Sequence, residues 1–346
     1  MGMPNVIELA HGGGGREMWS FIENFIVSKV PSSFRKAMNG IGLEELDDGA
    51  AIKIGNNYVV ISLDSFTVKP LFFPGGNLGS LAAAGSINDL VMMGAKPIAA
   101  MDALVVEAGT PIDVVEKILM SFINTLTSEG VAVIGGDFKV MPHGQVDVAV
   151  MSIAGIGITK RLIVDSELKP GDKIIVTNTI AEHGTTIIAA QLGYADRIKV
   201  QSDSKPLAKL LLPIYEKFGS FIRAARDPTR GGVAAVLTEW ASITGTTIVI
   251  NRAEIPIKQE VKHFLDMLGI DPLNVACEGI ALLGVDPNIA SDIVKELHSR
   301  GARNATIIGE VRTPKNPVLR GKVVAITEIG GATIIEPQAA PVPRIC

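Results

Sequence analysis

The sequence predicts a mixed α/β fold of two domains followed by a C-terminal tail. Its 346 residues, 47% apolar and 20% charged, suffice for the core of one large or two ordinary domains. Short apolar runs typical of strands alternate with helix-like segments through both halves of the chain. Packing signals stop after residue 331. We therefore expect a first domain over residues 1–160, a second over 161–331 and a tail over 332–346.

The first half begins this alternation with an apolar run that ends at Asp64. A later apolar run is closed by Gly135-Gly136-Asp137, and a small-residue stretch between the two runs predicts a closely packed helix. The strands expected here cover residues 58–63, 131–134 and 146–153, and the helices cover residues 77–93 and 111–129.

The second half repeats the pattern after a polar connection over residues 160–172. The run from Asp227 to Gly232 is expected to open a helix, because proline suits an early helical position. The strands expected in this half cover residues 173–176, 246–250, 279–285 and 322–328, and the other helices cover residues 185–192, 204–217 and 289–301.

Composition excludes several classes of function. A net charge of −4 with no basic block gives no footprint for nucleic acid, so we expect no such partner. No apolar run is long enough to span a bilayer, and two cysteines cannot build a disulfide framework. We expect a cytoplasmic protein without a membrane partner. The phosphate-loop and dinucleotide glycine motifs are absent as well, which disfavours those two nucleotide-binding folds.

Aspartates recur at the ends of the expected elements, and together they suggest a site for metal-bound ATP. Mg²⁺ prefers carboxylate oxygens combined with substrate phosphates, so dispersed aspartates that converge on one crevice would suit it. For any single aspartate, a turn or capping role is the stronger interpretation. The set comprises Asp47, Asp48, Asp64, Asp89, Asp137 and Asp227, with Asn88 beside Asp89.

Two glycine-containing runs could hold phosphate. The run Asp227-Pro228-Thr229-Arg230-Gly231-Gly232 would present backbone amides at a helix N-terminus, although a well-capped helix explains it equally. The run from His11 to Arg16 combines four glycines with a cation, and a loose N-terminus is its simpler interpretation. Lys139 could hold a phosphate or polarise an oxygen. Burial could make Glu278 a proton acceptor, whereas His183 could act chemically or merely pack.

The last residue, Cys346, ends a proline-rich segment, and Cys277 is the only other cysteine. Prolines 337, 341 and 343 favour an extended arm, which could reach roughly 45 Å at about 3.1 Å per residue. Such a thiol could be loaded by another enzyme and carried to a site. The alternative is a disordered end with an incidental cysteine.

Taken together, these segments resemble the HypE family of hydrogenase maturation proteins. That family belongs to a superfamily with aminoimidazole ribonucleotide synthetase, selenophosphate synthetase and thiamine monophosphate kinase. The resemblance covers nearly the whole chain. It is carried by residues 11–16, 47–50, 64–66, 70–76, 88–89, 135–139, 227–232 and 277–279 and by the terminal Pro343-Arg344-Ile345-Cys346.

The resemblance implies a two-domain PurM-like fold whose N-terminal domains join in a homodimeric barrel. It also implies ATP and Mg²⁺, with dehydration of a carbamoyl group on the terminal cysteine to a thiocyanate that supplies cyanide ligands to [NiFe] hydrogenase. The implied partners are a HypF-like carbamoyltransferase and a HypC–HypD-like scaffold.

The implied roles can be assigned to residues of this chain. Cys346 would carry the substrate, Glu278 would remove amide protons and Lys139 would add a cation near the transferring group. The Mg²⁺ and phosphate ligands would be Asp48, Asp64, Asp89 and Asp227, and the further nucleotide contacts would be Asn88, Asp137, Lys139, Thr229 and Gly231. Two alternatives stay open: a superfamily relative acting on a diffusible small substrate, and a non-catalytic carrier or scaffold.

Overall fold

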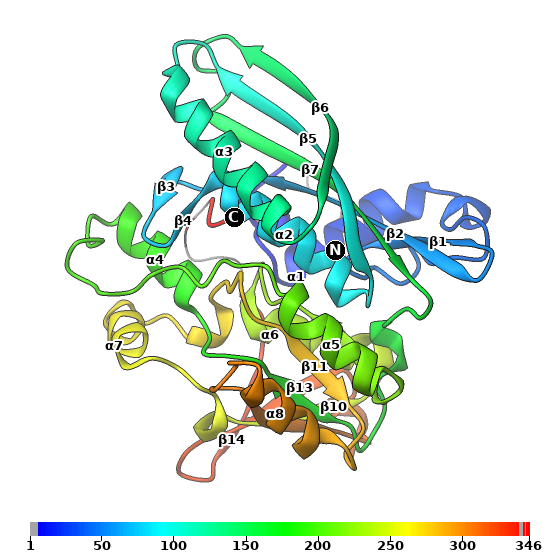
Figure 1. Cartoon of the computed structure of the whole chain (residues 1–346). Helices are drawn as coiled ribbons and strands as arrows, with labels where there is room; N and C mark the ends of the chain where they lie inside the picture. The colour runs from blue at the N-terminus through cyan, green and yellow to red at the C-terminus, as the bar shows by residue number, and fades with distance from the viewer. Residues whose placement is uncertain (1–5, 339–341, 343) are drawn as a thin grey trace.

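Each half of the chain builds one mixed β-sheet with helices packed against it (Figure 1). The structure, a computed structural model, describes residues 6–338, 342 and 344–346. Both halves combine α and β elements, as the sequence predicted. A short helix α1 (Arg16–Phe21) precedes the first sheet, and a small β3–β4 hairpin (Phe72–Phe73 and Gly76–Asn77) precedes helix α2.

The N-terminal sheet has the strand order β1-β2-β7-β5-β6. Only β5 and β6 are parallel, and helix α3 (Ile112–Ser128) connects them. The strands are β1 (Ala50–Ile54), β2 (Asn57–Phe66), β5 (Lys96–Glu107), β6 (Ala132–Met141) and β7 (Ala149–Thr159).

Helix α2 (Leu78–Met92) is buried along almost its whole length, because small residues let its neighbours approach closely. A Cβ on Gly79 would lie 1.9 Å from the Ile118 carbonyl oxygen, and one on Gly85 would lie 2.7 Å from the Phe66 ring. The helix packs against β2, β7 and α3 and also contacts α5 of the second half. It therefore carries its side chains into the junction between the two halves.

The C-terminal sheet has the strand order β14-β13-β10-β12-β8-β11-β9, and only the β10–β13 pair is parallel. Its strands are β8 (Lys173–Val176), β9 (Ile222–Arg226), β10 (Thr247–Asn251), β11 (Leu282–Val285), β12 (Thr306–Arg312), β13 (Lys322–Ile326) and β14 (Ala332–Ile335). The helices of this half are α4 (Glu182–Gln191), α5 (Ala208–Phe218), α6 (Gly232–Thr244), α7 (Gln259–Leu268) and α8 (Ala290–Ser299). No described helix is long and apolar enough to cross a membrane.

The structure corrects the expected strand ends at two aspartates. Asp64 does not close a strand, since β2 continues to Phe66. Gly135-Gly136-Asp137 does not close one either, because β6 runs through it to Met141 and pairs with β5. Gly136 is needed within that pair, since a Cβ there would lie 2.6 Å from the Asp102 carboxylate. The sequence analysis did not predict strands β1, β3, β4, β5, β9 and β12 or helices α1 and α7.

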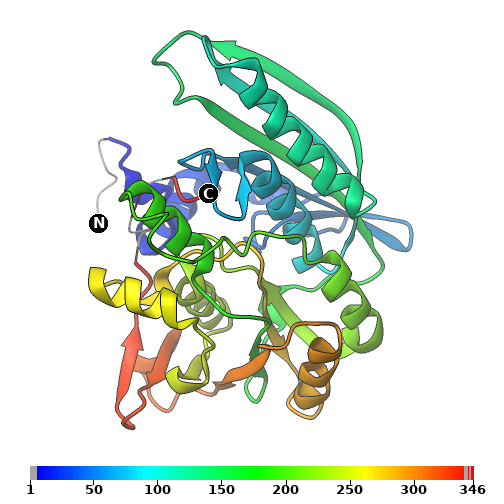
Figure 2. The same ribbon diagram turned by 60° about the vertical axis from the view of Figure 1, so that its left-hand side comes forward.

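The predicted start of the tail, at residue 332, is wrong. Residues 332–335 form β14, an edge strand antiparallel to β13, and Ile335 is buried. The end of the chain also returns between the two halves (Figure 2). Ile345 is only 4% exposed there and belongs to the main hydrophobic core. Apolar packing of Ile345 thus holds the end of the chain in the fold.

Candidate active site

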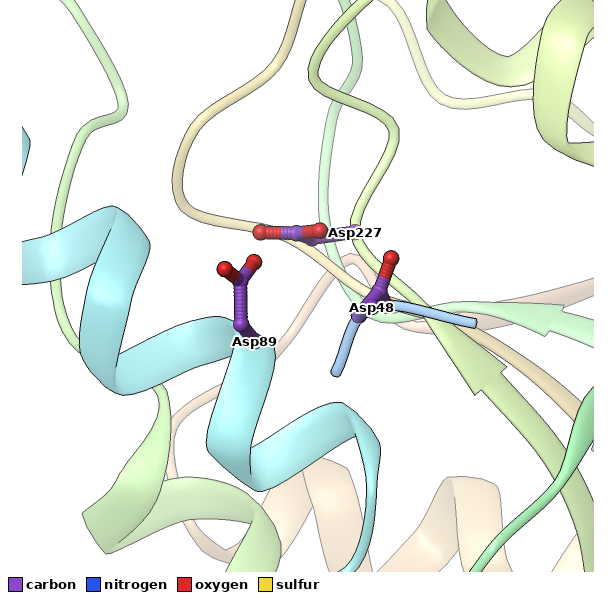
Figure 3. A group of neighbouring side chains, drawn as sticks. All are labelled: Asp48, Asp89 and Asp227. Atoms are coloured by element: carbon purple, nitrogen blue, oxygen red, sulfur yellow. The ribbon is translucent and has the colours of Figure 1, made fainter. Parts of the chain in front are cut away.

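Three aspartates from separate elements meet at the junction of the two halves. Asp48 lies just before β1, Asp89 lies in the buried helix α2, and Asp227 follows strand β9. Each offers one carboxylate oxygen to a group in which these atoms all lie within 4.8 Å of one another. Figure 3 shows the three side chains turned toward a common point. The fold therefore assembles part of the aspartate set that the sequence predicted.

The electrostatics of this group suit a bound cation. Burial raises the pKa of Asp48 and of Asp89 well above their usual range, and neighbouring carboxylates add to the effect. Burial and the Asp64 charge raise the pKa of Asp227 to about 7. One oxygen each of Asp48 and Asp227 is buried without a hydrogen-bond partner among the described residues. Oxygen ligands of this kind fit Mg²⁺, whose charge would relieve their repulsion.

Asp64 belongs to the same group of charges. Its carboxylate raises the pKa of both Asp89 and Asp227, and its Oδ1 lies 3.5 Å from Nη2 of Arg230. In the sheet register Asp64 is opposite Ile153, a fully buried residue. Asp64 therefore extends from the helix-covered face of the sheet toward the aspartates.

We call Asp48, Asp64, Asp89 and Asp227 the acidic set. The terminal cysteine shares a cavity with two of them. The cavity measures about 150 Å³, and we call it the Cys346 cavity. It lies between β2, α2 and the two loops that carry Arg230 and Glu278. Its lining comprises Gly12, Asp64, Ser65, Phe66, Thr67, Gly85, Asp89, Thr229, Arg230, Glu278 and Cys346.

Glu278 is a buried carboxyl group in the lining of the Cys346 cavity. It is 1% exposed, and neither of its oxygens has a nitrogen or oxygen hydrogen-bond donor among the described residues. Burial raises its pKa well above the usual range, and the Asp227 and Asp203 charges raise it further. Its backbone is held firmly, since Asp203 accepts hydrogen bonds from the amides of Glu278 and Gly279.

The Cys346 thiol is protonated in this position. Burial raises its pKa, the Glu278 charge raises it further, and Arg230 opposes the shift. A thiol of raised pKa is a poor nucleophile. Its position fits a group that carries a substrate rather than one that attacks it.

A larger pocket of about 590 Å³ adjoins the Cys346 cavity. The N-terminal glycine run lies directly on the loop before α6, where a Cβ on Gly14 would lie 2.7 Å from the Gly231 amide nitrogen. Both glycines have positive φ, at 77° and 73°, so side chains here would be strained as well as crowded. The two predicted phosphate loops thus form one wall, and Thr229 and Arg230 border both spaces.

Comparison with known proteins identifies the fold and the family. Models of the AIR synthase related protein match this chain, the N-terminal domain over residues 46–159 and the C-terminal domain over residues 169–322. A hydrogenase expression/formation protein of Methanocaldococcus jannaschii is 40% identical, covering 97% of this chain and 98% of its own. The carbamoyl dehydratase HypE of Rhizobium leguminosarum is 36% identical, covering 98% and 95%. This chain belongs to the HypE family.

Solved HypE structures agree with this assignment. A HypE–HypF complex matches with a TM-score of 0.83 at 32% identity, covering 92% of this chain and all of that one. HypE in complex with ATP matches with a TM-score of 0.81 at 29% identity, covering 99% of this chain and all of that one. The predicted family and fold class are confirmed.

Not every predicted site residue of this HypE chain reaches the cavity. The Asn88 side chain lies in the fold instead: its amide donates to the Lys205 and Glu278 carbonyls, and its oxygen accepts from the Leu207 amide. Both polar atoms of the side chain are engaged in these bonds, which hold the Glu278 loop. The predicted contact of Asn88 with the cofactor stays a prediction.

Asp137 and Lys139 lie away from the Cys346 cavity of their own chain. Directly paired strand residues share a face of the sheet, and Asp64 shares its face with Gly136 through Ile153 and Asp102. Asp137 and Lys139 consequently extend from the opposite face. Their side chains are 68% and 63% exposed and lie 3.8 Å apart. Within one HypE chain they do not meet the acidic set.

The structure adds residues that sequence reasoning missed. Arg226 is a buried cation that pairs with Glu239 at 2.8 Å and with Asp48 at 3.2 Å, and it thereby holds the loop that carries Asp48. Arg230 was visible inside the Asp227 to Gly232 run, yet no role was given to it. His183 was noted as ambiguous, and its contact with the chain end could not be read from local sequence.

Proposed function

We propose that this chain catalyses ATP-dependent dehydration of a carbamoyl group carried on Cys346, giving a thiocyanate. The observation that carries the proposal is the shared cavity: the terminal thiol lies beside Glu278, Arg230 and two aspartates of the acidic set. A relative named carbamoyl dehydratase and a solved HypE with ATP support it. A small diffusible substrate fits less well, because the chain's own end occupies the cavity.

The reaction needs phosphate as a leaving group, because an amide oxygen leaves poorly. The carbamoyl oxygen attacks the γ-phosphorus of ATP, ADP departs, and the nitrogen loses one proton. The carbon–oxygen bond then breaks, phosphate leaves with the bonding electrons, and loss of the second nitrogen proton completes the nitrile. One carbamoyl group and one ATP give one thiocyanate, ADP, phosphate and a proton.

Glu278 would take the nitrogen protons, since its raised pKa makes it a stronger base than an exposed carboxylate. Arg230 would neutralise charge on the transferring phosphoryl group or the carbamoyl oxygen. Asp48, Asp64, Asp89 and Asp227 would hold Mg²⁺, which when bound neutralises phosphate charge and orients the chain of phosphates. Thr229 and the Gly231 amide would contact the phosphates at the start of α6.

We infer that a second copy of the chain pairs with this one, because Asp137 and Lys139 face away from the Cys346 cavity of their own chain. The sheet face bearing Asp137 and Lys139 is open and carries exposed apolar side chains, including Leu63 and Met101. Pairing of this face with a partner's would cover it and could bring Lys139 to the partner's cavity. A homodimeric barrel of this kind is the arrangement we propose.

The proposed partners follow from the chemistry of the tail. A carbamoyltransferase must load Cys346, and the solved HypE–HypF complex supports a HypF-like enzyme in that role. An iron-assembly scaffold of the HypC–HypD kind would accept the cyano group for the [NiFe] hydrogenase centre. Both cysteines are free thiols, which supports a reducing compartment such as the cytoplasm.

Intact-protein mass spectrometry tests the reaction. The chain is incubated with a carbamoyl-transferring partner, carbamoyl phosphate and ATP, with Mg²⁺ present or chelated. The expected result is a carbamoyl adduct on Cys346 that loses the mass of one water only with ATP and Mg²⁺. An adduct that never loses water, despite bound ATP, would refute dehydration.

A further inference from the structure

Arg344 and Ile345, the two residues before the terminal cysteine, are each held by hydrogen bonds that do not involve the thiol. The Arg344 guanidinium donates to the Asp147 carboxylate and to the Thr67 carbonyl, with a third bond of 3.3 Å to the Asp147 carbonyl. The Lys69 amide donates to the Arg344 carbonyl at 3.0 Å. Lys69 also pairs with Asp147 at 2.8 Å, which fixes the acceptor of the arginine.

His183 binds the next residue through its backbone. Its Nε2 lies 2.8 Å from the Ile345 carbonyl oxygen, and its Nδ1 lies 2.7 Å from the Ser202 hydroxyl. A carbonyl oxygen can only accept, so Nε2 carries the hydrogen and Nδ1 accepts from Ser202. Burial lowers the pKa of His183 to about 4, so the ring stays neutral and keeps this tautomer at neutral pH.

Further contacts hold His183 in place. Phe73 meets it edge-on with centroids 5.5 Å apart, and the His183 amide donates to Asp203 at 3.0 Å. Asp203 is the same carboxylate that holds the amides of Glu278 and Gly279. One buried aspartate thus fixes both the residue that binds the chain end and the loop of the proposed base.

We propose that Thr67, Lys69, Asp147 and His183 form a docking site for a C-terminal peptide ending in arginine, an aliphatic residue and cysteine. Its ligand is the chain's own residues 344–346, and His183 is its central positioning residue. Asp147 and His183 lie outside the lining of the Cys346 cavity, so docking does not require a free thiol. A loaded or an unloaded tail can therefore bind, and the site aligns whatever Cys346 carries with Glu278.

Docking has an opposite consequence for loading. The docked Cys346 is half-buried and its thiol has a raised pKa, so an external carbamoyltransferase should act on the undocked tail. Weaker docking should therefore speed loading and slow dehydration. This second readout rests on the proposed function, whereas docking itself can be measured without ATP or any partner.

The test is the rate at which iodoacetamide alkylates Cys346 in the full chain, followed by intact mass. Loss of one neutral hydrogen bond in His183→Phe should raise this rate about three- to tenfold, because the undocked fraction rises by that factor. His183→Gln keeps a donor and should recover part of the protection. Arg344→Glu, which repels Asp147, should raise the rate at least as much from the tail side.

The chain offers a matched control in His298, whose Nε2 contacts the Ala305 carbonyl at 2.7 Å on helix α8. His298→Phe loses the same kind of bond elsewhere and should leave Cys346 alkylation unchanged. Cys277 is fully buried, so its alkylation reports general loosening of the fold. If Cys277 reacts in His183→Phe, Arg344→Glu decides the matter. Unchanged Cys346 alkylation in Arg344→Glu, or in a folded His183→Phe, would overturn the docking site.

Discussion

The Glu278 carboxylate and the Cys346 thiol line one cavity, and the glutamate charge raises the pKa of the cysteine. The two residues are far apart in sequence. Asn88 and Asp203 hold the loop that carries Glu278, and the docked chain end brings in Cys346. A base beside a thiol that it does not deprotonate makes sense when the proton to be removed belongs to a group carried on the sulfur.

Glu278→Gln should stop dehydration while carbamoyl loading continues. The amide keeps the size of the side chain but cannot accept the nitrogen protons, so a rate loss of about 10²- to 10⁴-fold is expected. Mass spectrometry should show the carbamoyl adduct accumulating on Cys346. The exposed Glu254→Gln serves as the matched control, and normal thiocyanate formation by Glu278→Gln would exclude Glu278 as the base.

Arg230→Ala should lower the rate of dehydration about 10²- to 10³-fold, because one preorganised cation beside the reacting group is lost. Added guanidinium should restore part of the rate if the charge itself is what the reaction needs. The control is Arg300→Ala, which removes a surface pair with Glu296. An unchanged turnover rate, or a loss that appears only as weaker ATP binding, would remove Arg230 from the chemical step.

Ligand-free protein should lose stability as the pH rises toward about 7. Burial raises the pKa of Asp227 from 3.8 to about 7, so the folded chain binds this proton more tightly than the unfolded chain. The stabilising contribution is full at low pH and is lost between those two values. Mg²⁺ should therefore raise the unfolding temperature more at about pH 8 than at about pH 6, since the aspartates then no longer carry protons.

Asp227→Asn provides the comparison for this effect. Its unfolding temperature should depend less on pH, and Mg²⁺ should stabilise it less at any pH. Equal stabilisation of the two chains by Mg²⁺ would place the metal elsewhere. Circular dichroism melts over a pH series are sufficient for the measurement.

Asp64 and Asp227 could be predicted from the sequence, because Asp64 follows an apolar run and Asp227 opens a helix. The strand that carries Asp137 could not be placed, since Gly135 and Gly136 resemble a turn. Only pairing with β5 shows that the strand continues through them. Local sequence also gave no sign of Thr67 or Asp147, whose part depends on where the chain end returns. Contacts formed between distant segments are invisible to patterns read over a few residues.

Lys139 acts across the dimer in our proposal, and mixing two inactive variants tests it. Lys139→Ala and Cys346→Ala should each be inactive alone. In a mixed dimer, the chain that keeps Cys346 would receive Lys139 from its partner, so one site would work. Random exchange makes half of the dimers mixed with one working site each, giving about a quarter of the wild-type rate.

A second mixture supplies the control for subunit exchange. Glu278 lines the cavity of its own chain's Cys346, so Glu278→Gln mixed with Cys346→Ala leaves every Cys346 without its base. That mixture should stay inactive. Activity in both mixtures would mean that the tail enters the partner's cavity, because Glu278 would then act across the dimer too. Activity in neither, with exchange verified by mass, would place Lys139 outside the partner's site and leave its exposed position on β6 without a catalytic role.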